Sequence, residues 1–170
     1  CQTVRFAPID AEDIKKHLLQ TKKFSPDDAA LLAKLSSGSI GKALNLDLGK
    51  FREQRESILK VVESLIVSHN RAILLKTAEE MNDAKNKDYY NDYLTILQTV
   101  IHDIWLLNLR DDSEIVNADL KNQLDRLANN ADRNKLAEWL REIENLREKF
   151  TVNLNKKIAT DALFMQMASH

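Results

Sequence analysis

The side chains best suited to chemistry are scattered along this sequence and do not form a metal-binding motif. The histidines His17, His69, His102 and His170 each lack a second histidine or a cysteine at the spacing of metal ligands. His102 precedes Asp103, but sequence neighbours on a helix point in different directions. We therefore expect structural or solvated histidines and no metal site.

Two acidic pairs could in principle supply a general acid and a general base. These pairs are Glu79-Glu80 and Asp111-Asp112. Both lie where a helix would end or a loop would begin. Surface charge explains such positions better than catalysis does, so we predict no catalytic role for either pair.

Nucleotide chemistry within this chain has no support from its motifs. The chain holds only 3 glycines and no Gly-Lys-Ser/Thr, whereas a phosphate loop or dinucleotide fingerprint needs closely spaced glycines. Trp105 and Trp139 fit the apolar stripes of helices, and Met165 and Met167 are typical of packing or interface positions. The sequence therefore predicts no cofactor and no enzymatic activity of its own.

The composition indicates a helical protein. Hydrophobic residues make up 44% and charged residues 30% of the 170 residues, as in an ordinary globular domain. The chain has 3 Gly and 2 Pro, so it is poor in the residues that tight turns need. We therefore expect an all-α fold of long helices with few sharp bends.

Charge and cysteine usage limit the partners and the compartment. A formal net charge of −1 at pH 7 lacks the basic excess typical of nucleic-acid-binding proteins, so no strong direct binding to nucleic acid is expected. Cys1 is the single cysteine and cannot form an internal disulfide. No apolar run is long enough to span a membrane, and no signal peptide opens the chain. These features predict a cytoplasmic protein without membrane contact.

The first residues are typical of the interior of a folded domain rather than of its start. The chain begins with Cys1 instead of Met, and Thr3 to Phe6 is β-branched and aromatic, which indicates the tail of a strand. Pro8 then ends this strand. We expect a further part of the protein to precede it, and that part would be the place for catalytic chemistry.

Three short helices are predicted next. Their N-caps are Asp10, Ser25 (followed by Pro26) and Ser39. Gly38 is suited to end the second helix in a left-handed conformation, and the third helix is expected to run through Leu48 to Gly49. Because about 40 residues give only a marginal core, these helices are expected to pack on something else.

Longer amphipathic helices follow. They are predicted over the apolar runs Ile58–Ile66, Ile73–Met81, Tyr90–Leu107, Leu120–Leu127, Leu136–Phe150 and Ile158–Met167. The run Tyr90–Leu107 is apolar on more than one face, so its helix is expected at the centre of a bundle. We predict a three-helix unit over residues 1–49, then a bundle of about five to six helices over residues 50–170.

The segment from Leu32 to Leu44 carries the most specific pattern. A Leu-Ala is followed by the Gly38-Ser39 pair and then by Ala-Leu on a new helix. This pattern resembles the lid subdomain of AAA+ clamp loader subunits of bacterial DNA polymerase III, where the Gly-Ser turn begins the helix that carries the sensor 2 arginine. The segments Cys1–Ile9 and Asn153–Leu163 resemble the same family, so the likeness spans the chain.

One departure from the family pattern concerns nucleotide binding. The position of the sensor 2 arginine falls on Gly41, and Lys42 stands where ATP-binding gamma/tau subunits have Asp. Gly-Ser-x-Gly-Lys/Arg-Ala-Leu resembles the delta prime type of subunit, which does not hydrolyse ATP. Gly38, Ser39, Gly41 and Lys42 would then form a degenerate sensor 2 region, although Lys42 could still swing toward a phosphate.

The resemblance implies a function in assembly. Residues 1–49 would be an AAA+ lid, and residues 50–170 would be a helical collar that binds the gamma/tau and delta subunits. The whole complex would load the sliding clamp onto primed DNA. Tyr89, Phe164 and Met167 are expected to lie off the main core stripes and to contact partner subunits.

Other functions stay open at this point. The chain could be the lid and C-terminal domain of an ATP-hydrolysing gamma/tau subunit, against which Gly41 argues. It could be a generic helical scaffold for protein interaction, with the family likeness due to chance. Direct DNA binding is a further alternative, which the net charge disfavours.

Overall fold

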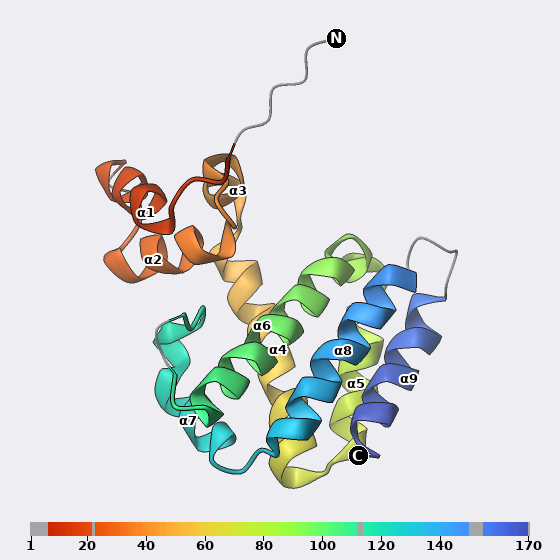
Figure 1. Ribbon diagram of the computed structural model, residues 1–170. Helices are drawn as coiled ribbons and strands as arrows, with labels where there is room; N and C mark the ends of the chain where they lie inside the picture. The colour runs from red at the N-terminus through yellow and green to blue at the C-terminus, as the bar shows by residue number, and fades with distance from the viewer. Residues whose placement is uncertain (1–6, 22, 112–113, 150–154, 170) are drawn as a thin grey trace. The chain divides into compact units, whose positions relative to one another are not determined.

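The computed structural model describes residues 7–21, 23–111, 114–149 and 155–169. The chain forms two compact units, Cys1–Phe51 and Arg52–His170, called here the first and second units. Every regular element within the described ranges is helical (Figure 1). The predicted all-α class is therefore confirmed, whereas the strand tail expected at residues 3–6 lies outside the described ranges.

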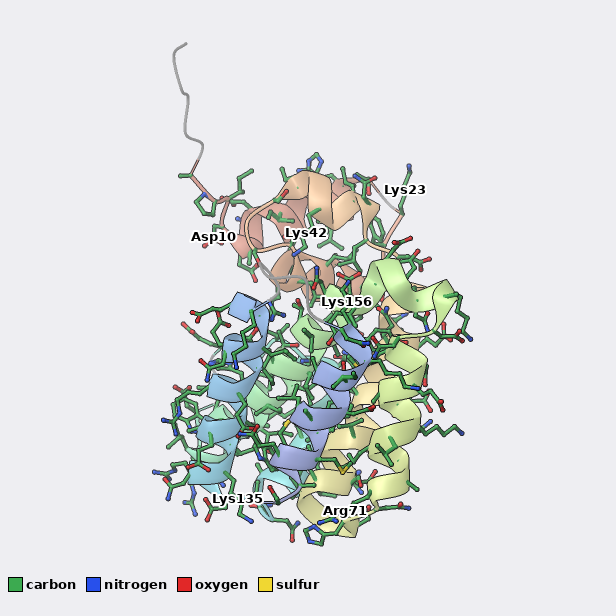
Figure 2. The ribbon with its side chains drawn as sticks, turned by 90° about the vertical axis from the view of Figure 1, so that its right-hand side faces the viewer. Asp10, Lys23, Lys42, Arg71, Lys135 and Lys156 are labelled. Atoms are coloured by element: carbon green, nitrogen blue, oxygen red, sulfur yellow. The ribbon has the colours of Figure 1, made fainter. Side chains whose placement is uncertain are left out.

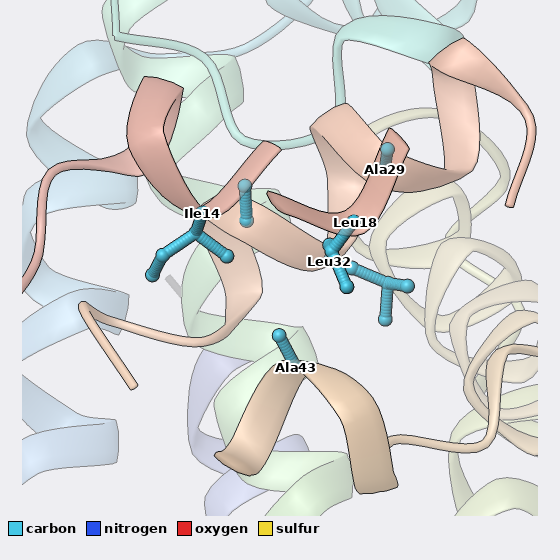
Figure 3. Packing of buried hydrophobic residues seen from close by; sticks show 6 residues of the cluster. Ile14, Leu18, Ala29, Leu32 and Ala43 are labelled. Carbon is cyan, nitrogen blue, oxygen red and sulfur yellow. The ribbon is translucent and has the colours of Figure 1, made fainter. Parts of the chain in front are cut away.

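The first unit contains three short helices that begin where the sequence predicts. These are α1 (Ala11–Gln20), α2 (Pro26–Leu35) and α3 (Ile40–Asn45). The predicted N-caps Asp10, Ser25 and Ser39 accept hydrogen bonds from the backbone N–H groups of Glu12, Asp28 and Lys42. Between the helices lies a small apolar core of Ile14, Leu18, Ala29, Leu32, Ala33 and Ala43 (Figure 3).

The turn between α2 and α3 requires glycine at position 38. Gly38 has a φ of 84°, which confirms the predicted left-handed conformation. Its carbonyl accepts the Ile9 N–H at 3.0 Å. A Cβ at this position would overlap the Pro8 side chain and lie 2.8 Å from Pro8 Cα. The glycine thus permits both the turn and the close passage of residues 8–9.

Replacing Gly38 with Ala is expected to destabilise the first unit by roughly 2 kcal/mol, because alanine resists a positive φ and its Cβ would overlap Pro8. A core this small has little stability to lose. Hydrogen exchange at the α1 and α2 amides, measured by mass spectrometry, should become faster. Exchange equal to that of the unchanged protein would contradict the prediction.

The third helix does not reach Gly49 as predicted. It ends at Asn45, and α4 (Leu48–Glu63) already begins at Leu48. Asp47 explains the difference, because its Oδ1 accepts the Lys50 N–H at 3.0 Å and so supplies a new N-cap. Gly49 therefore lies in the first turn of α4, where it does not end a helix.

The second unit is a helical bundle. After α4 come a π-helical turn (Ser64–Ser68), α5 (Arg71–Met81), η2 (Ala84–Tyr89), α6 (Tyr90–Asn108), η3 (Ala118–Leu120), α7 (Lys121–Ala128), α8 (Arg133–Lys149) and α9 (Lys156–Met167). The six α-helices within the described ranges agree with the predicted five to six. Helix α6 packs against α7 and α8, and α9 packs against α5 and α8 (Figure 1).

Candidate protein-interaction surfaces

The predicted degenerate sensor 2 region lies at the turn into α3. Ser39 caps the helix by accepting the Lys42 N–H at 3.2 Å, and the Lys42 side chain is exposed. Gly41 is exposed as well, and a Cβ built on it would have no heavy atom within 4 Å. Its φ is not positive, since Gly38 is the glycine that takes that conformation. Neither backbone conformation nor crowding therefore requires glycine at position 41.

Gly41→Ala is expected to stabilise the first unit slightly, by about 0.5 kcal/mol, because alanine loses less backbone entropy in a helix. The added methyl group would point into open space. Slower hydrogen exchange at the α3 amides would show this gain. The variant is also the matched control for Gly38→Ala, since the same methyl group is added three residues further along the chain, to a glycine whose Cβ position has no neighbours. A loss of stability would mean that the glycine has a structural role after all.

The three predicted interface residues differ in exposure. Tyr89 is 41% exposed at the end of η2, so it can reach a partner. Phe164 is 0% and Met167 is 1% exposed, and both lie on the buried face of α9. The expectation that these two lie off the core is wrong, because α9 turns this face toward the rest of the bundle. Phe164 and Met167 can therefore contribute to an interface only indirectly, by packing α9 against the bundle.

A surface that the sequence pattern missed lies on the opposite face of α9. Ile158 opens the apolar run from which the last helix is predicted, but it is 64% exposed, and Ala162 one turn later is exposed as well. Together with Leu146, Lys149 and other α8 and α9 residues they line a groove of about 350 Å³. The exposed Ile158 and the hollow beside it make this surface a candidate contact site. We call this surface the α8–α9 groove.

Contacts on the far side of α9 explain why Ile158 faces outward. Lys156, labelled in Figure 2, has its Nζ 4.9 Å from the centre of the Tyr90 ring, and Tyr90 Oη lies 2.7 Å from Thr160 Oγ1. Burial raises the pKa of Tyr90, although its hydrogen bond to Thr160 acts in the opposite direction. Lys157 pairs with Glu79 of α5 at 3.6 Å. The two contacts with Tyr90 hold the opposite side of α9 against the bundle, which leaves Ile158 on the exposed side.

A second groove runs between α4 and α7. It has a volume of about 390 Å³, and its lining includes Arg55, Leu59, Lys60 and Leu120. Arg55 is itself buried, and its guanidinium binds both carboxylate oxygens of Asp119, with 2.9 Å between Nη1 and Oδ1. Such a two-point ion pair fixes the side chain that forms the wall. We call this surface the α4–α7 groove.

The acidic pair Glu79-Glu80 divides into two environments. Glu79 is exposed, as predicted for surface charge, whereas Glu80 is half-buried. Glu80 Oε1 accepts hydrogen bonds from Ser57 Oγ at 3.0 Å and from Tyr93 Oη at 3.2 Å. Burial raises the pKa of Tyr93, and the negative charge of Glu80 raises it further. The tyrosine therefore stays protonated, and the cluster joins α4, α5 and α6 rather than serving as an acid–base pair.

The remaining candidates for chemistry stay apart. His17 and His69 are exposed, and the half-buried His102 lies near Trp105, with 6.2 Å between the ring centres. His170 and Asp112 are outside the described residues. Among the described residues no three His, Cys, Asp or Glu side chains come together as metal ligands. None of the described helices is both long and apolar enough to cross a membrane.

The described residues of the second unit form a helical bundle with two surface grooves. A family model described as DNA polymerase III, delta subunit, C terminal, matches residues 49–167. The match covers well over half of the chain, so the chain belongs to this family and carries the C-terminal domain of a DNA polymerase III clamp loader subunit. No curated protein gives a significant match.

Proposed function

We propose that this chain is the C-terminal part of the delta prime type of clamp loader subunit. In this proposal residues 1–49 are an AAA+ lid, and residues 50–170 are the collar domain that joins the ring of subunits. The chain would contribute to assembly and would not hydrolyse ATP. Its partners would be the gamma/tau and delta subunits, and the whole ring would place the sliding clamp on primed DNA.

The observation that carries this proposal is the state of Gly41. The glycine stands where the ATP-binding relatives have their sensor arginine, and nothing in the surrounding structure requires a glycine there. A Cβ built at this position has no heavy atom within 4 Å, so a side chain could begin here without a clash at its first carbon. The absence of a side chain that contacts nucleotide is therefore better explained by function than by folding, which favours a subunit that does not use ATP.

A second candidate is the delta type of subunit. The matching family model is described by the delta subunit rather than by delta prime, and it covers residues 49–167, outside the Gly41 region. The two candidates agree on a collar that assembles the ring. They differ in the place that the chain takes within it.

Reconstitution of the ring distinguishes these candidates. The chain is mixed with purified gamma/tau and either delta or delta prime from the same source, and light scattering after gel filtration gives the masses. A complete complex with gamma/tau and delta would support the delta prime type, whereas completion with gamma/tau and delta prime would identify the delta type. If the chain elutes alone from every mixture, the collar assignment is wrong.

The α8–α9 groove and Tyr89 are the proposed contact sites in this assembly. Ile158→Asp and Tyr89→Ala should weaken the complex, since each removes exposed apolar surface from the second unit. The substitution Lys135→Ala on an exposed position of α8 is the matched control and should leave assembly unchanged.

In the full-length protein Lys42→Ala should leave nucleotide affinity unchanged, and a large loss of affinity would contradict the proposed absence of ATP use.

A further inference from the structure

A fully buried carboxylate organises the connection between α6 and α7. Asp103 of α6 is 0% exposed. Its Oδ1 accepts the Val116 N–H at 3.0 Å, and its Oδ2 accepts the Asn117 N–H at 2.7 Å. The Asn117 side-chain amide also donates to Oδ2 at 2.8 Å. Three N–H groups of one short segment therefore bind one carboxylate on a helix that lies earlier in the chain.

The same segment is held from its other side by α4. Arg55 Nη1 donates to the Asn117 side-chain oxygen at 3.1 Å, and the guanidinium also binds the carboxylate of Asp119. Asn117 is the link, because its side chain accepts from Arg55 and donates to Asp103. We call Arg55, Asp103, Asn117 and Asp119 the buried polar network. It joins positions that are more than 60 residues apart.

The apolar side chains of this segment are only partly buried. Within residues 116–120, Val116 and Leu120 are only half-buried, and Ala118 is exposed. Asn117 is the member of the segment that is buried. Ile115, directly before the segment, is a buried apolar side chain, and no apolar side chain within residues 116–120 is buried to the same degree. Polar contacts to Asp103 and Arg55 are therefore the main attachment of residues 116–120 to the bundle.

We propose that the buried polar network is a conformational device: it holds residues 116–120 against α4 and α6, and this segment is released as a local unit while the rest of the bundle stays folded. Local opening of this kind is governed by the contacts of the segment and not by the global stability. Because Arg55 and Leu120 both line the α4–α7 groove, release of the segment also removes one wall of that groove.

Hydrogen exchange of Asp103→Asn tests the proposal on the whole chain. Asparagine at position 103 keeps one acceptor oxygen and places an NH2 group, which cannot accept, where the second carboxylate oxygen stood, so at least one of the three bonds from the segment is lost and the others lose their anionic acceptor. The Val116 and Asn117 amides should exchange at least about tenfold faster, and this increase should far exceed any change at the α8 amides. Acceleration of both sets by one common factor would mean global unfolding and would overturn the proposal. Unchanged exchange at Val116 and Asn117 would overturn it too.

Asn117→Ala keeps the proposal testable if Asp103→Asn does not fold. The alanine removes the link between Arg55 and Asp103 from a short connecting segment and leaves both helices intact. Faster exchange confined to residues 116–120 supports local release, and exchange like that of the unchanged protein rejects it. Asp92→Asn is the control, because it makes the same chemical change at an exposed position of the same helix.

Discussion

Replacing Phe164 with alanine is expected to lower the free energy of unfolding of the second unit by about 3–5 kcal/mol. The ring is 0% exposed on the buried face of α9, which packs against α5 and α8. Truncation removes the apolar contacts of the ring and leaves a cavity that a close-packed core fills only in part. Urea unfolding followed by tryptophan fluorescence measures this loss.

Ile158→Ala is the matched control on the same helix. Its side chain is 64% exposed, so truncation should change the stability by less than about 1 kcal/mol. In the ring-assembly measurement Ile158→Ala should have the larger effect of the two substitutions, because Ile158 lies on the exposed α8–α9 groove and can contact a partner directly. If Phe164→Ala unfolds at the same urea concentration as the unchanged protein, the buried position of α9 is wrong.

Arg55→Met should destabilise the second unit by about 2–3 kcal/mol. Methionine keeps an apolar stem of similar length but leaves Asn117 and the Asp119 carboxylate without their cationic donor. The expected loss is below that for a fully buried ion pair, because the Asp119 side chain is 35% exposed and can regain water. Urea unfolding at pH 7 gives the value.

Arg52→Met provides the comparison for this prediction. Arg52 is one turn earlier on α4 and is exposed, so its replacement should cost less than about 0.5 kcal/mol. The double variant Arg55→Met with Asp119→Asn should recover part of the stability, since it removes the uncompensated carboxylate. Equal losses from Arg55→Met and Arg52→Met would show that the buried network adds nothing to stability.

The features that the sequence predicted correctly are local ones. Capping residues act within a single turn, so Asp10, Ser25 and Ser39 mark helix starts without any knowledge of the tertiary fold. Gly38 is predictable for the same reason, because a positive φ is a property of one residue. The predicted extension of α3 to Gly49 is wrong, because Asp47 caps a new helix before the apolar pattern of α3 would end.

The features that were not predictable depend on contacts between distant segments. Helix α9 has apolar residues on two sides, and its contacts with the rest of the bundle decide that Phe164 is buried and Ile158 exposed. The ion pair between Arg55 and Asp119 joins residues 64 positions apart, and no periodic pattern links them. Both candidate grooves therefore emerged only from the structure.

The division into two units decides what optical probes can detect. Both tryptophans, Trp105 and Trp139, and all 3 tyrosines lie after residue 51, so the first unit contains neither residue type. Intrinsic fluorescence and near-ultraviolet absorbance of these rings therefore record the unfolding of the second unit, while the first unit could melt without a signal. A tryptophan introduced at Phe24, which packs on the core of the first unit, would give that unit its own chromophore and allow the two transitions to be followed in one sample.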